Sequence, residues 1–145
     1  MSRLLLLVLP LLAGCVAGAM PSDAGRDSAL YASLGHRYEA RQWLAANRNP
    51  SALASNRFAT TAAGRAFVDS LYRLGAAKVE VTNVQEESSR LREDGGPYSD
   101  ALLVTLPADK RQRAALFAVN AAEARREGFD AEPDRGQTLL YFWWD

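Results

Sequence analysis

The chain has 145 residues, of which 17 are Lys or Arg and 17 are Asp or Glu, so its formal net charge at pH 7 is zero. A neutral chain without a long basic block is unsuited to binding nucleic acids through their phosphates, because that mode needs clustered positive charge. A single Cys and a single His exclude a disulfide framework and a His-rich metal site within one chain.

The amino-terminal residues have the three parts of a secretory leader. Arg3 supplies the positive charge, residues 4–12 form an apolar run, and two small residues follow. The motif Leu12-Ala13-Gly14-Cys15 then has the pattern of a lipobox, in which a Cys directly follows the cleavage point. This segment resembles the precursors of bacterial lipoproteins, and the resemblance covers residues 1–15 only.

The resemblance implies that the Cys15 thiol carries a diacylglycerol group, that residues 1–14 are removed and that the new amino terminus is acylated. Two or three acyl chains attach a protein to a membrane almost permanently, whereas one chain anchors it only marginally. Val16 is not the Asp that favours inner-membrane retention, so the resemblance to Gram-negative lipoproteins implies an outer-membrane anchor facing the periplasm.

Three other interpretations of the leader compete with the lipobox. It is an ordinary secretory signal if Cys15 is incidental. A transmembrane helix would need about 20 apolar residues, and the apolar run here is shorter and contains Pro10. A buried strand is disfavoured by Arg3 and by the lack of alternation.

Two segments precede the predicted domain. Residues 15–27 are predicted to be the lipidated Cys and a flexible tether, because small and polar residues predominate there. Residues 28–48 are predicted to form one helix, because Leu30, Leu34 and Tyr38 recur at a spacing of four.

Residues 55–145 are predicted to form one α+β domain. The expected elements are a short strand over residues 55–59, a helix from Thr61 to a Gly75 cap, a strand over 78–82, a polar loop over 85–99, a strand over 101–106, a helix from Asp109 to a Gly128 cap, and a strand over 138–144. With the first strand included, the order is βαββαβ, which predicts a ferredoxin-like sandwich with helices on one face of an antiparallel sheet.

Three basic residues stand at the predicted start of the second domain helix. Lys110, Arg111 and Arg113 are unfavourable there by roughly 0.3–1 kcal/mol each, because the positive end of the helix dipole repels them. Such a local misfit makes them candidates for binding an anion together with free backbone N–H groups. The alternative is ordinary solvation, with Asp100 and Asp109 offsetting the charge.

The last predicted strand is apolar on both faces. Alternation places Leu139, Tyr141 and Trp143 on one face and the other row, with Trp144, on the opposite face. One row must then lie on the sheet face that helices leave open, which the polar Lys78, Glu80 and Thr82 of a neighbouring strand predict to be solvated. That row is exposed, or it is covered by the amino-terminal helix through Tyr31, Tyr38 and Trp43, or it docks on a partner through the candidate residues Tyr141, Trp143 and Trp144.

No catalytic, cofactor or metal site is predicted. His36 is expected to be a solvated helix residue, and residues 130–136 fail as a calcium loop because the glycine is one position late and Tyr141 stands where a Glu is needed. We therefore expect a non-enzymatic, lipid-anchored envelope protein that binds a protein or peptide or has a structural role. The alternative is an accessory or sensor domain that binds a small ligand or an anion.

Overall fold

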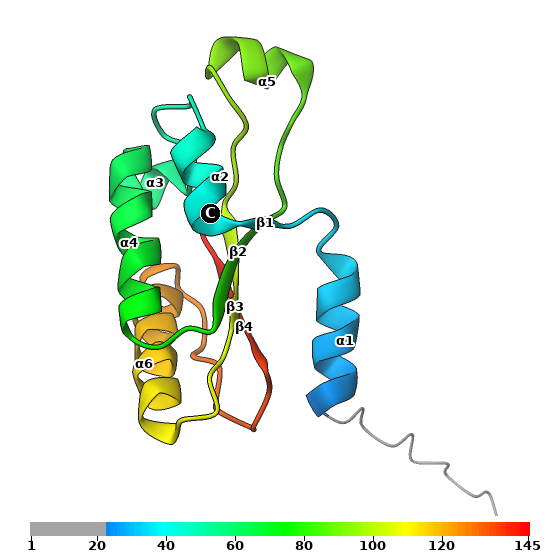
Figure 1. Ribbon diagram of the computed structural model, residues 1–145, viewed down its shortest axis with the longest axis vertical. Coiled ribbons are helices and arrows are strands. Elements are labelled where there is room, and N and C mark those ends of the chain that lie inside the picture. Colours follow the sequence, from blue (N-terminus) through cyan, green and yellow to red (C-terminus); the bar gives the residue numbers. More distant parts are fainter. Residues whose placement is uncertain (1–22) are drawn as a thin grey trace, which may run out of the picture.

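The computed structural model describes residues 23–145 (Figure 1), so Cys15 and the predicted leader lie outside the described residues. The elements, in chain order, are α1 (Asp23–Ser33), β1 (Tyr38–Glu39), α2 (Ala40–Ala46), α3 (Ser55–Phe58), α4 (Thr61–Arg73), β2 (Lys78–Thr82), α5 (Ser88–Glu93), β3 (Ala101–Thr105), α6 (Lys110–Arg126) and β4 (Leu139–Trp143). Among these helices, none has the length and apolar character needed to cross a membrane.

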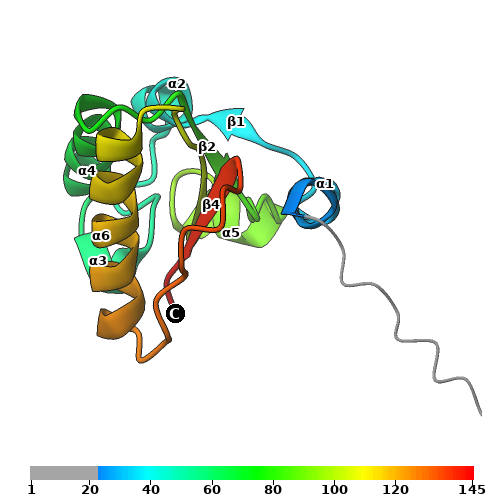
Figure 2. The same cartoon turned by 90° about the horizontal axis from the view of Figure 1, so that it is seen from below.

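The four strands form one antiparallel sheet in the order β1-β2-β3-β4. Figure 2 shows α2, α4 and α6 on one side of this sheet and α1 on the other, while α5 projects beyond the end of the strands in Figure 1. The α+β class, with helices packed on an antiparallel sheet, is thus confirmed.

The prediction of a first strand over residues 55–59 is wrong. Residues 55–58 form α3 and Ala59 is its C-cap, with hydrogen bonds from Phe58 N to Ala54 O (2.9 Å) and from Ala59 N to Ser55 O (3.0 Å). The helical turn aims Phe58 into the core, where its ring centroid lies 5.0 Å from that of Phe67. The strand order also differs from the predicted ferredoxin-like βαββαβ sandwich. Strands that are neighbours in this sheet are consecutive in the chain, whereas the split β-α-β units of a ferredoxin-like fold hold another strand between their two strands.

The prediction of one helix over residues 28–48 is also wrong. Gly35 has φ +60°, a left-handed conformation that ends the helical stretch after α1. Tyr38 and Glu39 then pair with β2, and the Glu39 carboxylate caps α2 by accepting from Gln42 N at 2.8 Å. The segment therefore supplies a helix, a sheet edge and a second helix.

The helix ends of the domain follow the sequence closely. The N-cap of α4 is Thr60, one residue before the predicted Thr61, and its side chain accepts from Ala63 N at 3.1 Å. Gly75 and Gly128 follow α4 and α6 with φ +103° and +81°, which confirms both predicted caps.

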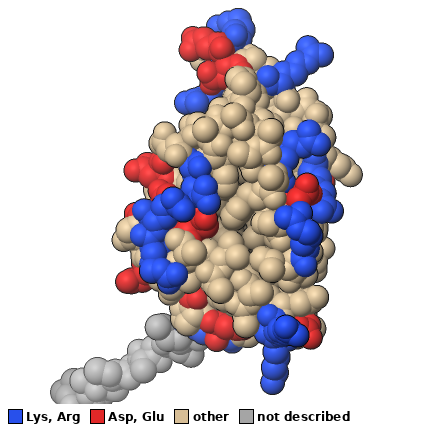
Figure 3. Space-filling view, turned by 90° about the vertical axis from the view of Figure 1, so that its left-hand side faces the viewer, with Lys and Arg blue, Asp and Glu red and all other residues tan. Residues whose placement is uncertain are grey.

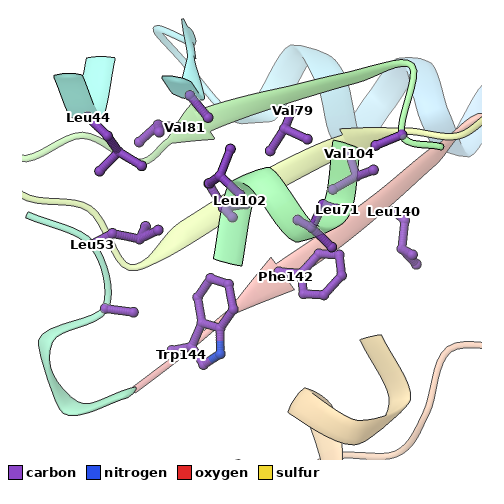
Figure 4. Close-up of a cluster of buried hydrophobic side chains, with 14 of the residues drawn as sticks. Leu44, Leu53, Leu71, Val79, Val81, Leu102, Val104, Leu140, Phe142 and Trp144 are labelled. Atoms are coloured by element: carbon purple, nitrogen blue, oxygen red, sulfur yellow. The ribbon is translucent and has the colours of Figure 1, made fainter. Parts of the chain in front are cut away.

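The main core lies between the sheet and α2, α4 and α6 (Figure 4). Four aromatic rings, from Phe58, Phe67, Phe142 and Trp144, pack there with centroid separations of 5.0 to 6.0 Å. The aliphatic side chains around them include Leu44, Leu53, Leu71, Val79, Val81, Leu102, Val104 and Leu140.

A second, smaller apolar cluster lies on the other face of the sheet. Leu30 and Leu34, from α1 and the residue after it, cover Leu103, Leu139 and Tyr141. Because of this cover, the predicted solvated face is partly buried.

Two polar residues of β2 show the same burial. Glu80, which is buried, accepts a 2.7 Å hydrogen bond from Lys78 Nζ, and the Thr82 side chain is buried as well.

Candidate functional site

The two rows of β4 side chains lie on opposite faces of the sheet, as the alternation predicts. Trp144 and Phe142 point into the main core, whereas Leu139 and Tyr141 pack under α1. Trp144 is only 1% exposed and Trp143 is 38% exposed. Of the three candidate partner-binding residues, Trp143 is thus exposed and Tyr141 half-buried. The inclusion of Trp144 was wrong, because its indole belongs to the core.

The amino-terminal segment covers β4 through residues other than those expected. Tyr38 and Trp43 pack in the main core, on the opposite side of the sheet, and Tyr31 is exposed. The cover comes instead from Leu30 and Leu34.

Trp143 forms an exposed aromatic pair with Phe129. Their ring centroids lie 5.4 Å apart at an interplanar angle of 32°, and Phe129 is 46% exposed. Phe129 follows the Gly128 cap of α6 and is held there by its own N–H, which donates to Ala124 O at 2.8 Å. Two large apolar side chains in contact at the surface are a typical feature of an interaction site.

β4 is an edge strand of the described sheet, because within residues 23–145 only β3 pairs with it. Leu106 N donates to Thr138 O at 2.8 Å and Trp144 N donates to Asp100 O at 3.0 Å, so the even-numbered residues direct their backbone groups at β3. In an antiparallel ladder these groups alternate in direction from one residue to the next. The N–H and C=O groups of residues 139, 141 and 143 therefore point away from the sheet.

Only one of these outward groups has a partner within the described residues. Asn120 of α6 donates its side-chain N–H to Tyr141 O at 2.8 Å. The outward N–H groups of Leu139, Tyr141 and Trp143 donate to no acceptor in residues 23–145. An edge of this kind is a template for another strand.

An open cleft of about 380 Å³ lies beside this edge. Its walls come from α6, from the segment that follows α6, and from β4, which lie side by side in Figure 2. The lining residues are Asn120, Glu123, Ala124, Phe129, Asp130, Glu132, Tyr141, Phe142 and Trp143.

The carboxylate of Glu123, which lines the cleft, has a structural role. Arg57 donates to its two carboxylate oxygens at 2.7 and 2.9 Å, and the Trp144 indole N–H donates at 3.0 Å. Burial alone would raise the pKa of Glu123, but the hydrogen bonds from Arg57 and Trp144, together with the charges of Arg57 and Arg126, outweigh it, so the pKa lies below its usual value. A carboxylate that stays ionised and paired in this way is a poor general acid at neutral pH.

The three candidate anion-binding residues do not converge. Asp109 caps α6 by accepting from Gln112 N at 2.9 Å. Arg113 donates to both carboxylate oxygens of Asp134, at 2.5 and 3.1 Å, and to Gln137 O at 3.0 Å, which lowers the pKa of Asp134. Lys110 and Arg111 remain exposed.

The basic side chains on the helix-covered side of the sheet likewise form no single positive patch. Figure 3 shows Lys and Arg side chains in separate groups around an uncharged centre, with Asp or Glu nearby.

The remaining candidates bring no reactive group together. His36 is exposed in the turn between α1 and β1, and the long polar loop contains α5. Within the part of the chain that the structure describes, no three His, Cys, Asp or Glu residues are grouped to hold a metal ion.

Sequence reasoning missed Asn120 and the pairing of Phe129 with Trp143. The available signals were a polar residue at a core-facing position of α6 and an aromatic residue directly after its cap. A scan against protein-family models and searches of curated proteins and of solved structures found no match to this chain.

Proposed function

We propose that this chain is a lipid-anchored, non-enzymatic protein of the cell envelope that binds an extended peptide segment of a partner protein at the β4 edge. The lipobox at Cys15 supports the anchor and the envelope location. The observation that carries the binding role is the row of three outward N–H groups beside the exposed Phe129–Trp143 pair.

Strand addition would use these features in two ways. Main-chain hydrogen bonds from an incoming strand to Leu139, Tyr141 and Trp143 supply affinity, at about 0.5–1.5 kcal/mol net for each bond. Alternate side chains of the incoming strand would reach the cleft and supply specificity. Asn120 occupies one outward carbonyl, so the edge favours a strand that accepts more hydrogen bonds than it donates.

The test uses two substitutions at one position. Trp143→Pro removes the outward N–H but no hydrogen bond to β3, and proline is tolerated on edge strands when its missing N–H faces solvent. Trp143→Phe keeps both the N–H and an aromatic ring. Ten-residue peptides selected from a random library against the full chain in detergent micelles are then titrated into each variant.

We expect Trp143→Phe to retain binding and Trp143→Pro to lose it. In the unmodified chain, bound peptide should slow the hydrogen exchange of the Leu139, Tyr141 and Trp143 amides. Equal binding by both variants, with no change in exchange at β4, would contradict strand addition. Because Trp43 and Trp144 are buried, the indole of Trp143 dominates any fluorescence change on binding in the unmodified chain. Both Trp143 variants lack that indole, so peptide binding to them is measured by calorimetry.

A further inference from the structure

The cleft beside β4 carries charge of one sign. Its charged lining residues are Glu123, Asp130 and Glu132, and no Lys or Arg of the part of the chain that the structure describes lines it. The rest of the lining is mainly aromatic or small, and it includes Phe129 and Trp143. A ligand that enters this cleft therefore meets carboxylates next to aromatic rings.

Two of the three carboxylates are available to a ligand. The carboxylate of Glu123 already accepts hydrogen bonds from Arg57 and Trp144. Asp130, directly after Phe129, is exposed and has no ion pair or hydrogen bond within the described residues. Glu132 uses only Oε1, which accepts from Arg135 at 3.3 Å and from Gln137 at 3.1 Å. Asp130 is thus free to pair with a cation, whereas Glu132 is already paired with Arg135 and has one oxygen left to accept a hydrogen bond.

Carboxylates beside aromatic faces suit a Lys or Arg side chain. A guanidinium stacks on an aromatic ring while its N–H groups donate to a carboxylate, and both contacts favour the same charge. The domain uses this combination internally: Arg41 lies 4.0 Å from the ring centroid of Tyr72 and donates to Asp69 at 2.7 Å.

We propose that the segment bound at β4 is cationic, with an Arg or Lys side chain placed between the Phe129–Trp143 pair and Asp130. This inference rests on the proposed function and adds the chemistry of the partner. The charge argues against a second copy as the occupant. The strand Leu139–Trp143 contains no basic residue, and the following Asp145 would bring more negative charge to the edge.

The experiment compares three matched peptides on the full chain in detergent micelles. Each has ten residues in which Val alternates with a second residue, which is Arg, Gln or Glu. Binding is followed by Trp143 fluorescence at physiological ionic strength. The test variant is the double substitution Asp130→Asn/Glu132→Gln. Its control is Glu87→Gln/Glu93→Gln, which removes the same charge from both ends of α5.

We expect the Arg peptide to bind about tenfold more tightly than the Gln peptide, and the Glu peptide most weakly. The Asp130→Asn/Glu132→Gln variant should lose most of this preference, while the control variant keeps it. If the Gln peptide binds the edge as tightly as the Arg peptide, the cationic partner is overturned and strand addition stands. If no peptide binds, both proposals fail. Concentration-dependent pairing of two chains through β4 would identify a second copy as the occupant and overturn this inference.

Discussion

The indole N–H of Trp144 donates a 3.0 Å hydrogen bond to Oε2 of Glu123, the oxygen that also accepts from Arg57 Nε at 2.7 Å. This arrangement joins the end of β4 to α6 and α3. It also holds Trp144 in the core while the preceding Trp143 stays at the surface, so it orients the edge to which we assign peptide binding.

Glu123→Ala should lower the free energy of unfolding by about 2–4 kcal/mol, because it leaves the Arg57 guanidinium and the Trp144 N–H without their acceptor. Urea unfolding followed by tryptophan fluorescence measures the loss. Arg126→Ala is the control, because Arg126 is exposed and lies 3.9 Å from the same carboxylate oxygen, so its removal should cost less than about 0.5 kcal/mol. Equal losses from the two substitutions would show that Glu123 is not a structural anchor.

The same carboxylate predicts a pH dependence of stability. Burial raises the pKa of Glu123, but the hydrogen bonds from Arg57 and Trp144 and the charges of Arg57 and Arg126 together lower it by more, so the pKa in the folded chain lies below the unfolded value. A lowered pKa means that the stabilisation is fully present above the unfolded pKa, about 4.3, and is lost as the pH falls through the folded pKa. Urea unfolding over a pH series should therefore show a steeper acid loss for the unmodified chain than for Glu123→Gln. Parallel curves below pH 5 would contradict the assignment.

Local features of the fold could be predicted from the sequence. The caps at Gly75 and Gly128 depend on residues within one turn, and the inward and outward rows of β4 follow from the period of two. β1 could not be predicted in this way. Two residues have no periodicity, and Tyr38 and Glu39 form a strand only because they pair with Val81 and Glu80.

The same limit applies to the candidate site. The sequence shows aromatic residues on both faces of β4, but the choice between Trp143 and Trp144 depends on which helices cover each face. Arg113 looked free because its partner Asp134 lies 21 residues further along the chain. Burial and long-range pairing decide which side chains are available to a partner, and neither can be deduced from the local sequence pattern.

The two helix-capping glycines should respond alike to alanine. Gly128→Ala meets no atom within 4 Å, so it carries only the strain of a positive φ, about 1 kcal/mol. At Gly75 a Cβ would overlap the Gln112 side chain, but Gln112 is exposed and its side chain can rotate away, so Gly75→Ala should also cost about 1 kcal/mol. The double variant Gly75→Ala/Gln112→Ala should therefore match Gly75→Ala in urea unfolding. A larger loss in Gly75→Ala that the second substitution relieves would show that the Gln112 side chain is held in place.

Releasing α1 from the sheet should leave the main core folded. Leu30 and Leu34 pack on Leu103 and Leu139, and Asp27 Oδ2 accepts from the N–H and the hydroxyl of Thr138, both at 2.6 Å. The main core lies on the opposite face of the sheet. The double substitution Leu30→Ser/Leu34→Ser should therefore release α1 while the rest of the domain stays folded.

Three measurements on this variant test the idea. Binding of a dye specific for apolar surface should rise, because the second cluster loses its cover. Amides of α1 should exchange faster, and those of Val79 and Val104 should keep their protection. Leu44→Ser, in the main core, is the matched control, and it should abolish cooperative unfolding. If dye binding and α1 exchange do not change, Leu30 and Leu34 do not hold α1 on the sheet, and Asp27 is left as the principal attachment.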